Sequence, residues 1–237
     1  MERHGSFHVE HAADQDAAQP LTAHLPDPPP AAAQVFGDRL PLARRYVRHL
    51  ATTGVDWGLL GPREVPRLWE RHVLNCAVLT QLLPDHARVA DIGSGAGLPG
   101  ITLALRRPDL DITLVEPLLR RVEWLSMVVD DLGLANVTVQ RARAEDLVGQ
   151  VTVPFVTARA VASLDRLCRW GLPLLEPGGE LLAIKGRSAE DEVARTSRAV
   201  RRAGGIDTEI MSLAADLLGD AVTVVRVRVS EGRPVRR

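Results

Sequence analysis

The segment from Asp91 to Gly100 constrains this chain more than any other part of its sequence. It reads Asp-Ile-Gly-Ser-Gly-Ala-Gly-Leu-Pro-Gly, with apolar residues directly before it and after it. This order is typical of a buried strand, a glycine turn and the first turn of a helix, because glycine adopts positive φ and leaves room for a close-lying ligand. The free N–H groups at the start of such a helix attract polar ligands. The segment therefore predicts a loop that binds a nucleotide-like cofactor.

One interpretation of the loop is a dinucleotide site. Gly95, Gly97 and Gly100 satisfy the G-x-G-x-x-G pattern, and Glu116 follows about 20 residues later, where a ribose-binding acid is expected. Such short glycine patterns recur by chance. On this interpretation the chain is an NAD-dependent oxidoreductase.

Asp91 favours a different cofactor, S-adenosylmethionine. A carboxylate at the buried end of a strand costs free energy unless a cationic or hydrogen-bonding group meets it. S-adenosylmethionine carries a sulfonium and an ammonium group, whereas a pyrophosphate is repelled by a carboxylate. On this interpretation Gly93, Gly95 and Gly97 form the turn, and Glu116 accepts hydrogen bonds from the ribose hydroxyls.

A polar segment, residues 141–146, follows the third predicted strand. In open α/β folds an adenine ring is commonly held at this place. Glu145 and Asp146 fit a solvated helix end equally well, so their spacing alone leaves both roles open.

Length and composition narrow the class of protein. A chain of 237 residues with 46% apolar residues is expected to form one soluble domain with short appendages. No apolar stretch approaches the roughly 20 residues of a membrane span, and the N-terminal segment lacks the apolar centre of a secretory signal. The only two cysteines, Cys76 and Cys168, fit a reduced, cytoplasmic protein.

The basic residues are almost all of one kind. The net charge is −1, so any surface that binds nucleic acid must be local. Of 29 basic residues 28 are arginine, and Lys185 is the single lysine. Against such a bias, a remaining lysine suggests that a planar guanidinium does not suit its site.

The chain divides into four predicted parts. Residues 1–33 are rich in proline and alanine and are predicted to be a disordered tail. The histidines of this tail lack cysteine or acidic partners at ligand spacing, so no metal site is predicted. Residues 34–84 are predicted as an N-terminal helical layer in which Pro66 opens the second helix. Residues 85–230 form the methyltransferase domain, and residues 231–237 a C-terminal tail.

Strands and helices alternate in the third part. Strands are predicted at residues 87–92, 111–116, 136–140, 155–158, 180–186, 206–213 and 221–229. The last two have no helix between them, which implies a terminal hairpin and an antiparallel last strand. The predicted fold class is α/β, with a Rossmann-like seven-stranded class I methyltransferase sheet. A nicotinamide enzyme usually shows a second βαβαβ half instead.

Five arginines lie on the polar side of the predicted helical layer. They fit either a solvated face or a surface that contacts phosphates. They are Arg44, Arg45, Arg48, Arg67 and Arg71.

From about Phe36 to Val229 the sequence resembles the RsmG (glucose-inhibited division protein B) family of methyltransferases of the small-subunit ribosomal RNA. The most specific motifs are Gly-Leu-Pro-Gly within the glycine loop and Arg-Ala-x-Ala-Ser after the fourth strand. The resemblance rests on Arg71-His72, Asp91 to Ile101, Arg120-Arg121-Val122, Ala158 to Ser163 and Ile184-Lys185-Gly186.

The resemblance implies methylation of a guanine N7 in the 530-loop region of 16S rRNA, in free rRNA or in the small ribosomal subunit, by a cytoplasmic monomer without a membrane segment. N7 carries a lone pair and no proton, so no catalytic base is assigned. Together, the loop and the family motifs place the cofactor on Asp91, Gly93, Gly95, Gly97, Leu98, Glu116, Ala144, Glu145 and Arg159. The basic positions implied near the RNA are Arg120, Arg143, Arg159 and Lys185.

Two departures from the family pattern lie in the helical layer. Asn75-Cys76 replaces an Asp-Ser pair, and residues 56–62 lack an Asn-Leu-Thr stretch. Both bear on contacts with RNA rather than on cofactor binding. Purely structural roles also remain open for two predicted RNA-facing residues: Lys185 could cap a strand end, and Arg159 could pair with a carboxylate such as Asp91.

Overall fold

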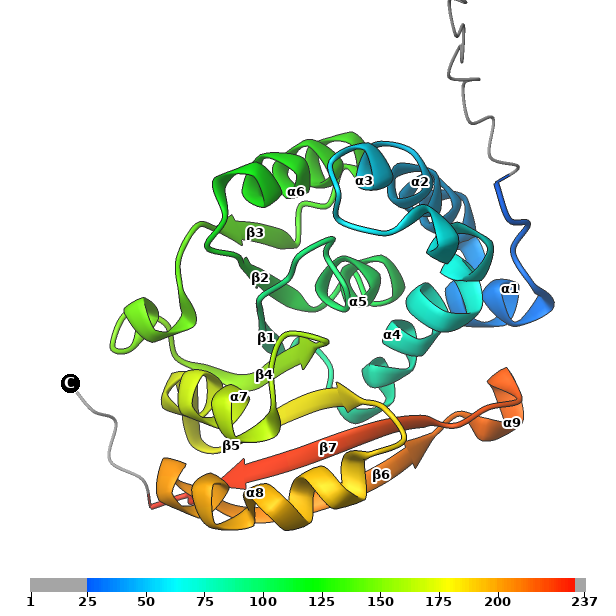
Figure 1. Ribbon diagram of the computed structural model, residues 1–237. Coiled ribbons are helices and arrows are strands. Elements are labelled where there is room, and N and C mark those ends of the chain that lie inside the picture. Colours follow the sequence, from blue (N-terminus) through cyan, green and yellow to red (C-terminus); the bar gives the residue numbers. More distant parts are fainter. Residues whose placement is uncertain (1–24, 233–237) are drawn as a thin grey trace, which may run out of the picture.

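The computed structural model describes residues 25–232 and contains one seven-stranded sheet (Figure 1). The strand order is β3-β2-β1-β4-β5-β7-β6. The strands are β1 Arg88–Ile92, β2 Asp111–Val115, β3 Val137–Gln140, β4 Val153–Arg159, β5 Leu175–Lys185, β6 Gly205–Leu213 and β7 Val222–Val229. β7 runs antiparallel to both of its neighbours, while β1 to β5 pair in parallel. The predicted fold class is therefore confirmed.

Two strand predictions need correction. β5 begins at Leu175, five residues before the predicted start at Glu180, because the Pro-Gly-Gly segment of residues 177–179 continues the strand. A register shift against β4, between Val153 and Phe155, accommodates this irregular segment. In addition, a one-turn helix, α9 (Ala215–Leu218), connects β6 and β7 where a simple hairpin was predicted.

Helices cover both faces of the sheet and form two separate apolar cores (Figure 1). The N-terminal layer packs on one face together with α5 (Gly100–Arg106) and α6 (Leu119–Leu132). The other face carries η5 (Ala144–Leu147), α7 (Leu164–Gly171), η6 (Leu172–Leu174) and α8 (Ala189–Ala203). The near-continuous apolar strands of the centre follow from burial on both faces.

The N-terminal layer consists of short helices. They are α1 (Pro30–Phe36), η1 (Gly37–Arg39), α2 (Leu40–Ala51), α3 (Thr53–Asp56), η2 (Pro62–Arg67), η3 (Leu68–Leu74), α4 (Asn75–Ala77) and η4 (Val78–Leu82). The prediction that Pro66 opens the second helix is wrong, since the helical run begins at Pro62. η2 and η4 are 3-10 helices and η3 is a π-helical segment. Such irregular turns are frequent at functional sites.

The predicted N-terminal tail overlaps α1, which begins at Pro30 and buries Ala32. Residues 1–24 and 233–237, and with them most of both predicted tails, lie outside the described residues. Within residues 25–232 no helix is long and apolar enough to cross a membrane. The same residues contain no group of three or more side chains placed to hold a metal ion.

Candidate cofactor-binding site

Asp91 lies at the carboxyl end of β1 and is fully buried. Its Oδ2 accepts a hydrogen bond of 3.0 Å from the backbone N–H of Gly100, the first residue of α5. Among residues 25–232, its Oδ1 has no hydrogen-bond partner. Burial raises the pKa of this carboxyl to about 7. A half-satisfied buried carboxylate is costly, so Oδ1 marks a place where a donor or a cation would be stabilising.

The loop glycines are required for different reasons. A β-carbon at Gly93 would lie 2.8 Å from the Val161 side chain, and one at Gly97 would lie 2.4 Å from Ile101. Gly95 has a φ of +56°. Among the described residues, a β-carbon added at Gly95 would have only the backbone oxygen of Gly93 within 4 Å, at 3.8 Å, apart from its chain neighbours. The space needed by a ligand therefore lies beside Gly95, whereas the other two glycines accommodate the protein's own side chains.

Gly100 allows α5 to approach the sheet closely. A β-carbon there would lie 2.2 Å from Leu114 of β2 and 2.8 Å from Asp91 Oδ2. The close helix–strand packing of nucleotide-binding loops depends on a glycine at such a position.

Glu116 is also buried, directly after β2. Its Oε2 accepts a 3.0 Å hydrogen bond from the N–H of Gly95, and its Oε1 accepts one of 3.1 Å from the N–H of Leu118. Arg121 lies 3.7 Å from Oε2. Each carboxylate oxygen has further acceptor capacity, so Glu116 can hold the loop and still accept hydrogen bonds from a ligand.

Tyr46 was not among the predicted site residues. It lies on α2 and is fully buried, and its hydroxyl donates a 2.7 Å hydrogen bond to the carbonyl of Ala96, inside the glycine loop. The N-terminal layer thus supports the cofactor loop directly. A signal existed in the sequence, since Tyr46 is the only tyrosine of the chain and shares a helical spacing with the apolar residues Ala43 and Leu50.

Arg159 turns toward the N-terminal layer and not toward Asp91. Its Nη2 donates to Nδ1 of His72 at 2.8 Å and to the carbonyl of Arg71 at 3.2 Å, and its Nη1 lies 3.5 Å from Sγ of Cys76. His72 Nε2 lies 2.8 Å from Oε2 of Glu64.

The protonation states of this network follow from the donors. A guanidinium only donates, so Nδ1 of His72 accepts and the ring proton sits on Nε2, facing Glu64. Burial, together with the charge of Arg159, lowers the pKa of His72, which keeps the ring neutral. Burial raises the pKa of the Cys76 thiol to about 11, so Cys76 stays protonated.

Lys185 is also turned inward. Its ammonium donates to the carbonyl of Ala162 and to Oε1 of Glu192, both at 3.0 Å, and its side chain is only 10% exposed. The same carboxylate oxygen accepts from the N–H of Leu164, the first residue of α7. This arrangement matches the structural alternative for Lys185, at the end of β5, and leaves little of the ammonium to face RNA.

The remaining predicted residues differ in burial. Leu98 and Ala144 are buried, while the side chains of Glu145 and Arg143 are exposed and have no hydrogen-bond partner within residues 25–232. Arg120 is exposed on α6. Its guanidinium lies 5.7 Å from the centre of the Trp57 ring and donates to the carbonyl of Asp56 at 3.4 Å.

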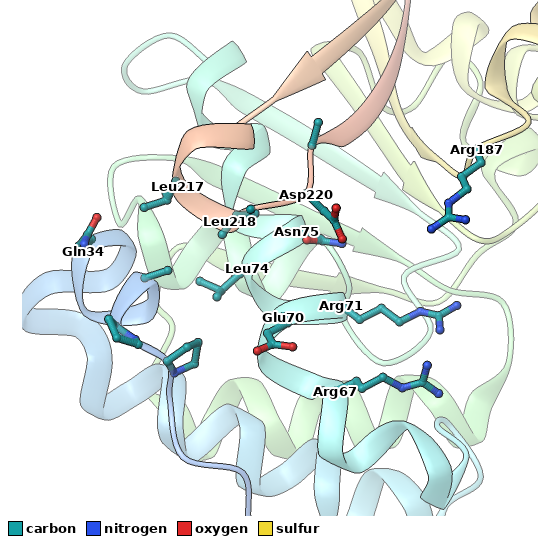
Figure 2. Close-up of a pocket in the computed structure, with 16 residues that line it drawn as sticks. Gln34, Arg67, Glu70, Arg71, Leu74, Asn75, Arg187, Leu217, Leu218 and Asp220 are labelled. Carbon is teal, nitrogen blue, oxygen red and sulfur yellow. The ribbon is translucent and has the colours of Figure 1, made fainter.

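A groove of about 1220 Å³ lies between the N-terminal layer, the loop after β5 and α9. Figure 2 shows the side chains of Arg67 and Arg71 extending in the same direction at one end of the groove, with the Arg187 side chain pointing toward them. Glu70 and Asp220 also line it, together with apolar residues of α9. The groove is thus basic at one end and mixed at the other.

Comparisons with known proteins identify the family of this chain. The family model described as GidB, rRNA small subunit methyltransferase G, matches residues 39–218. A protein of Pseudarthrobacter chlorophenolicus named Ribosomal RNA small subunit methyltransferase G is 57% identical over 85% of this chain and 93% of its own length. A protein of the same name from Mycolicibacterium smegmatis is 54% identical over 90% of this chain and 91% of its own length.

Solved structures show the same fold at low sequence identity. A putative S-adenosyl-L-methionine-dependent methyltransferase from Methanococcus maripaludis has a TM-score of 0.55 at 14% identity, covering 82% of this chain and 94% of that one. The [4+2]-cyclase SpnF has a TM-score of 0.53 at 16% identity, and the match covers 80% of this chain and 96% of that one. The family match and the two close relatives go further than fold: this chain belongs to the rRNA small subunit methyltransferase G (GidB) family.

Proposed function

We propose that this protein transfers a methyl group from S-adenosylmethionine to N7 of a guanine in the 530-loop region of 16S rRNA. The observation that carries the proposal is the fully buried Asp91, whose Oδ1 finds no partner in the described part of the chain, at the glycine loop of a chain that belongs to this family. A dinucleotide pyrophosphate would place further negative charge beside that carboxylate. The single sheet with an antiparallel β7 also lacks the second βαβαβ half of a nicotinamide enzyme.

The residues around the loop fit the methyl donor. Asp91 offers a carboxylate to a cationic group, Gly95 leaves open space, and Glu116 has acceptor capacity for ribose hydroxyls. Ala144 and Glu145 follow β3, where an adenine ring would be received. When bound, S-adenosylmethionine supplies an electrophilic methyl group.

The transfer itself requires little acid–base chemistry from the protein. The N7 lone pair forms the new bond to the methyl carbon, the carbon–sulfur bond breaks, and its electron pair stays on sulfur. N7 loses no proton, so no general base is assigned, and the methylated base becomes cationic. The protein then contributes alignment of the two reactants and exclusion of water. Alignment alone can lower the activation barrier by about several kcal/mol, through a high effective molarity.

The basic end of the groove supports an RNA substrate. Arg67 and Arg71 come from the N-terminal layer and Arg187 from the loop after β5, at the carboxyl edge of the sheet where ligands bind in open α/β folds. Arginine forks suit phosphate oxygens. Arg187 has no ion-pair partner within residues 25–232, so its charge is available to a phosphate.

Two measurements test the proposal. S-adenosylmethionine or S-adenosylhomocysteine should raise the melting temperature of the protein, and NAD should not. Methyl transfer should then be measured on free 16S rRNA and on small ribosomal subunits, with mapping of the modified base. Stabilisation by NAD alone, or methylation of an atom other than guanine N7, would contradict the proposal. The expected monomeric state and cytoplasmic location are checked by light scattering and by cell fractionation.

A further inference from the structure

The loop of residues 160–162, directly after β4, is flanked at both ends by half-buried cations. Ala160 adopts a φ of +54°, which few non-glycine residues do, so the loop needs support from its surroundings. On one side the Arg159 guanidinium is bound to the N-terminal layer. On the other side the Lys185 ammonium holds the carbonyl of Ala162.

Each cation is linked to an acid, Lys185 directly and Arg159 through His72. Glu64 accepts from the neutral His72, whose Nδ1 accepts from Arg159. Glu192 accepts from Lys185 and from the N–H of Leu164, at the start of α7. Two chains of contacts, Glu64–His72–Arg159 and Glu192–Lys185, therefore converge on the 160–162 loop from opposite faces of the sheet.

The loop lies against the cofactor loop. The two Cγ atoms of Val161 lie 2.8 and 2.9 Å from the position of a Gly93 β-carbon, so Val161 fills the space left by that glycine. Val161 is nevertheless 38% exposed, so another part of its side chain faces outward at the carboxyl edge of the sheet. Val161 therefore separates Gly93 of the cofactor loop from the space outside this edge of the sheet.

We propose that Arg159 and Lys185 are positioning residues, which act through the 160–162 loop and not by contact with RNA phosphates. The inference rests on the proposed methyl transfer, because it assigns the loop the task of aligning the target base with the methyl donor. It also explains the single lysine of the chain: a compact ammonium fits between one carbonyl and one carboxylate oxygen, where a planar guanidinium would need more room.

Variants of the two contact chains test the proposal. His72→Asn keeps an acceptor near the place of Nδ1 but cannot titrate, whereas His72→Leu removes the acceptor. Lys185→Met removes the ammonium and keeps the apolar stem, and Glu192→Gln is the milder variant should Lys185→Met fail to fold. The measurements are kcat and KM for the RNA substrate, the Kd of S-adenosylhomocysteine, and amide hydrogen exchange of residues 160–163.

His72→Leu and Lys185→Met are expected to lower kcat on the order of 10- to 100-fold, since small misplacements of reacting groups have such effects. Exchange of the loop amides should become faster, while the RNA KM and its salt dependence change little. His72→Asn should recover most of the wild-type kcat.

The pH profile separates positioning from a merely structural role. The charged groups that act on His72 are Glu64, Arg71 and Arg159, and the Cys76 thiol lies against Arg159. Protonation of Nδ1 would remove the acceptor of Arg159. The kcat of the wild type should therefore decrease at pH values below the ordinary histidine pKa of about 6.5. The His72→Asn variant should lack this acid limb.

Three results would overturn the proposal. The first is a raised RNA KM and a flatter salt dependence at unchanged kcat in Lys185→Met, which would indicate direct phosphate contact. The second is unchanged kcat despite faster loop exchange. The third is unchanged loop exchange in both His72→Leu and Lys185→Met. Failure of the methyl transfer proposal looks different, because then the wild type binds S-adenosylhomocysteine but methylates no RNA, while the exchange measurement still tests the contacts.

Discussion

Val161 occupies the space that a β-carbon at Gly93 would need, with its Cγ1 2.8 Å from that position. The glycine loop is therefore shaped by a neighbouring loop as well as by a ligand. Two motifs that lie about 70 residues apart in the sequence meet at this contact, and the contact can be tested by compensating substitutions.

Gly93→Ala should destabilise the protein by about 2–4 kcal/mol, from the left-handed backbone and the collision with Val161 together. Adding Val161→Ala should recover the part of the stability that the collision removes. The destabilisation that remains, from the backbone conformation, should be about 1–2 kcal/mol. Gly95→Ala is the matched control, because it has the same backbone conformation without a collision. Denaturant unfolding measures all three. Equal destabilisation by Gly93→Ala and Gly95→Ala would show that Val161 does not restrict position 93.

Tyr46→Phe should lower the free energy of unfolding by about 1–3 kcal/mol, because the buried carbonyl of Ala96 loses its hydrogen bond. S-adenosylhomocysteine should also bind more weakly, since that carbonyl belongs to the cofactor loop. Thermal unfolding and calorimetry are the measurements. The control is Thr52→Val, whose exposed hydroxyl bonds within its own helix and should change stability by less than about 0.5 kcal/mol. A Tyr46→Phe protein as stable as the control would contradict the assigned support.

The buried Asp91 carboxyl should make cofactor binding depend on pH. With its pKa raised to about 7, Asp91 is partly protonated in the free protein at neutral pH. A cationic ligand favours the carboxylate, so binding should release protons and strengthen as pH rises from 5.5 to about 7.5, below the titration of an α-amino group. Calorimetry in buffers of different ionisation enthalpy measures the release. Asp91→Asn should bind weakly at all pH values, and proton uptake by the wild type would be the opposite of the expected result.

The same carboxyl affects the stability of the free protein. A folded pKa above the unfolded one means that the folded state binds more protons between the two values. The contribution of Asp91 to the free energy of unfolding should therefore fall as pH rises from about 4 to about 7, the range set by its raised pKa. Asp91→Asn should lack this decrease in a denaturation series across pH.

Arg187→Gln should weaken binding of the RNA substrate and flatten its salt dependence. If Arg187 neutralises one phosphate, the slope of log affinity against log salt should fall in magnitude by about 0.7–0.9. Filter binding at several salt concentrations measures the slope. Arg195→Gln, on α8 and outside the groove, is the charge-matched control and should leave the slope unchanged. The same flattening in both variants would mean that only net charge matters.

The sequence by itself determined the cofactor loop and the class of sheet. The run from Asp91 to Gly100 is a local pattern, and positive φ at Gly93, Gly95 and Gly97 is a property of single residues. The alternation of apolar strands and helices is likewise local, and parallel pairing of β1 to β5 follows from the crossover helices. Local patterns also placed Glu116 correctly, at the end of β2 beside the loop.

Only the tertiary structure decided the directions of the side chains. Arg159 meets His72 across 87 positions of sequence, and Tyr46 reaches Ala96 across 50. A motif places both basic residues, Arg159 and Lys185, at the carboxyl edge of the sheet, but each can turn either outward or into the protein. The direction depends on acceptors supplied by other elements, because a cation turned away from water is stable only where such groups meet it.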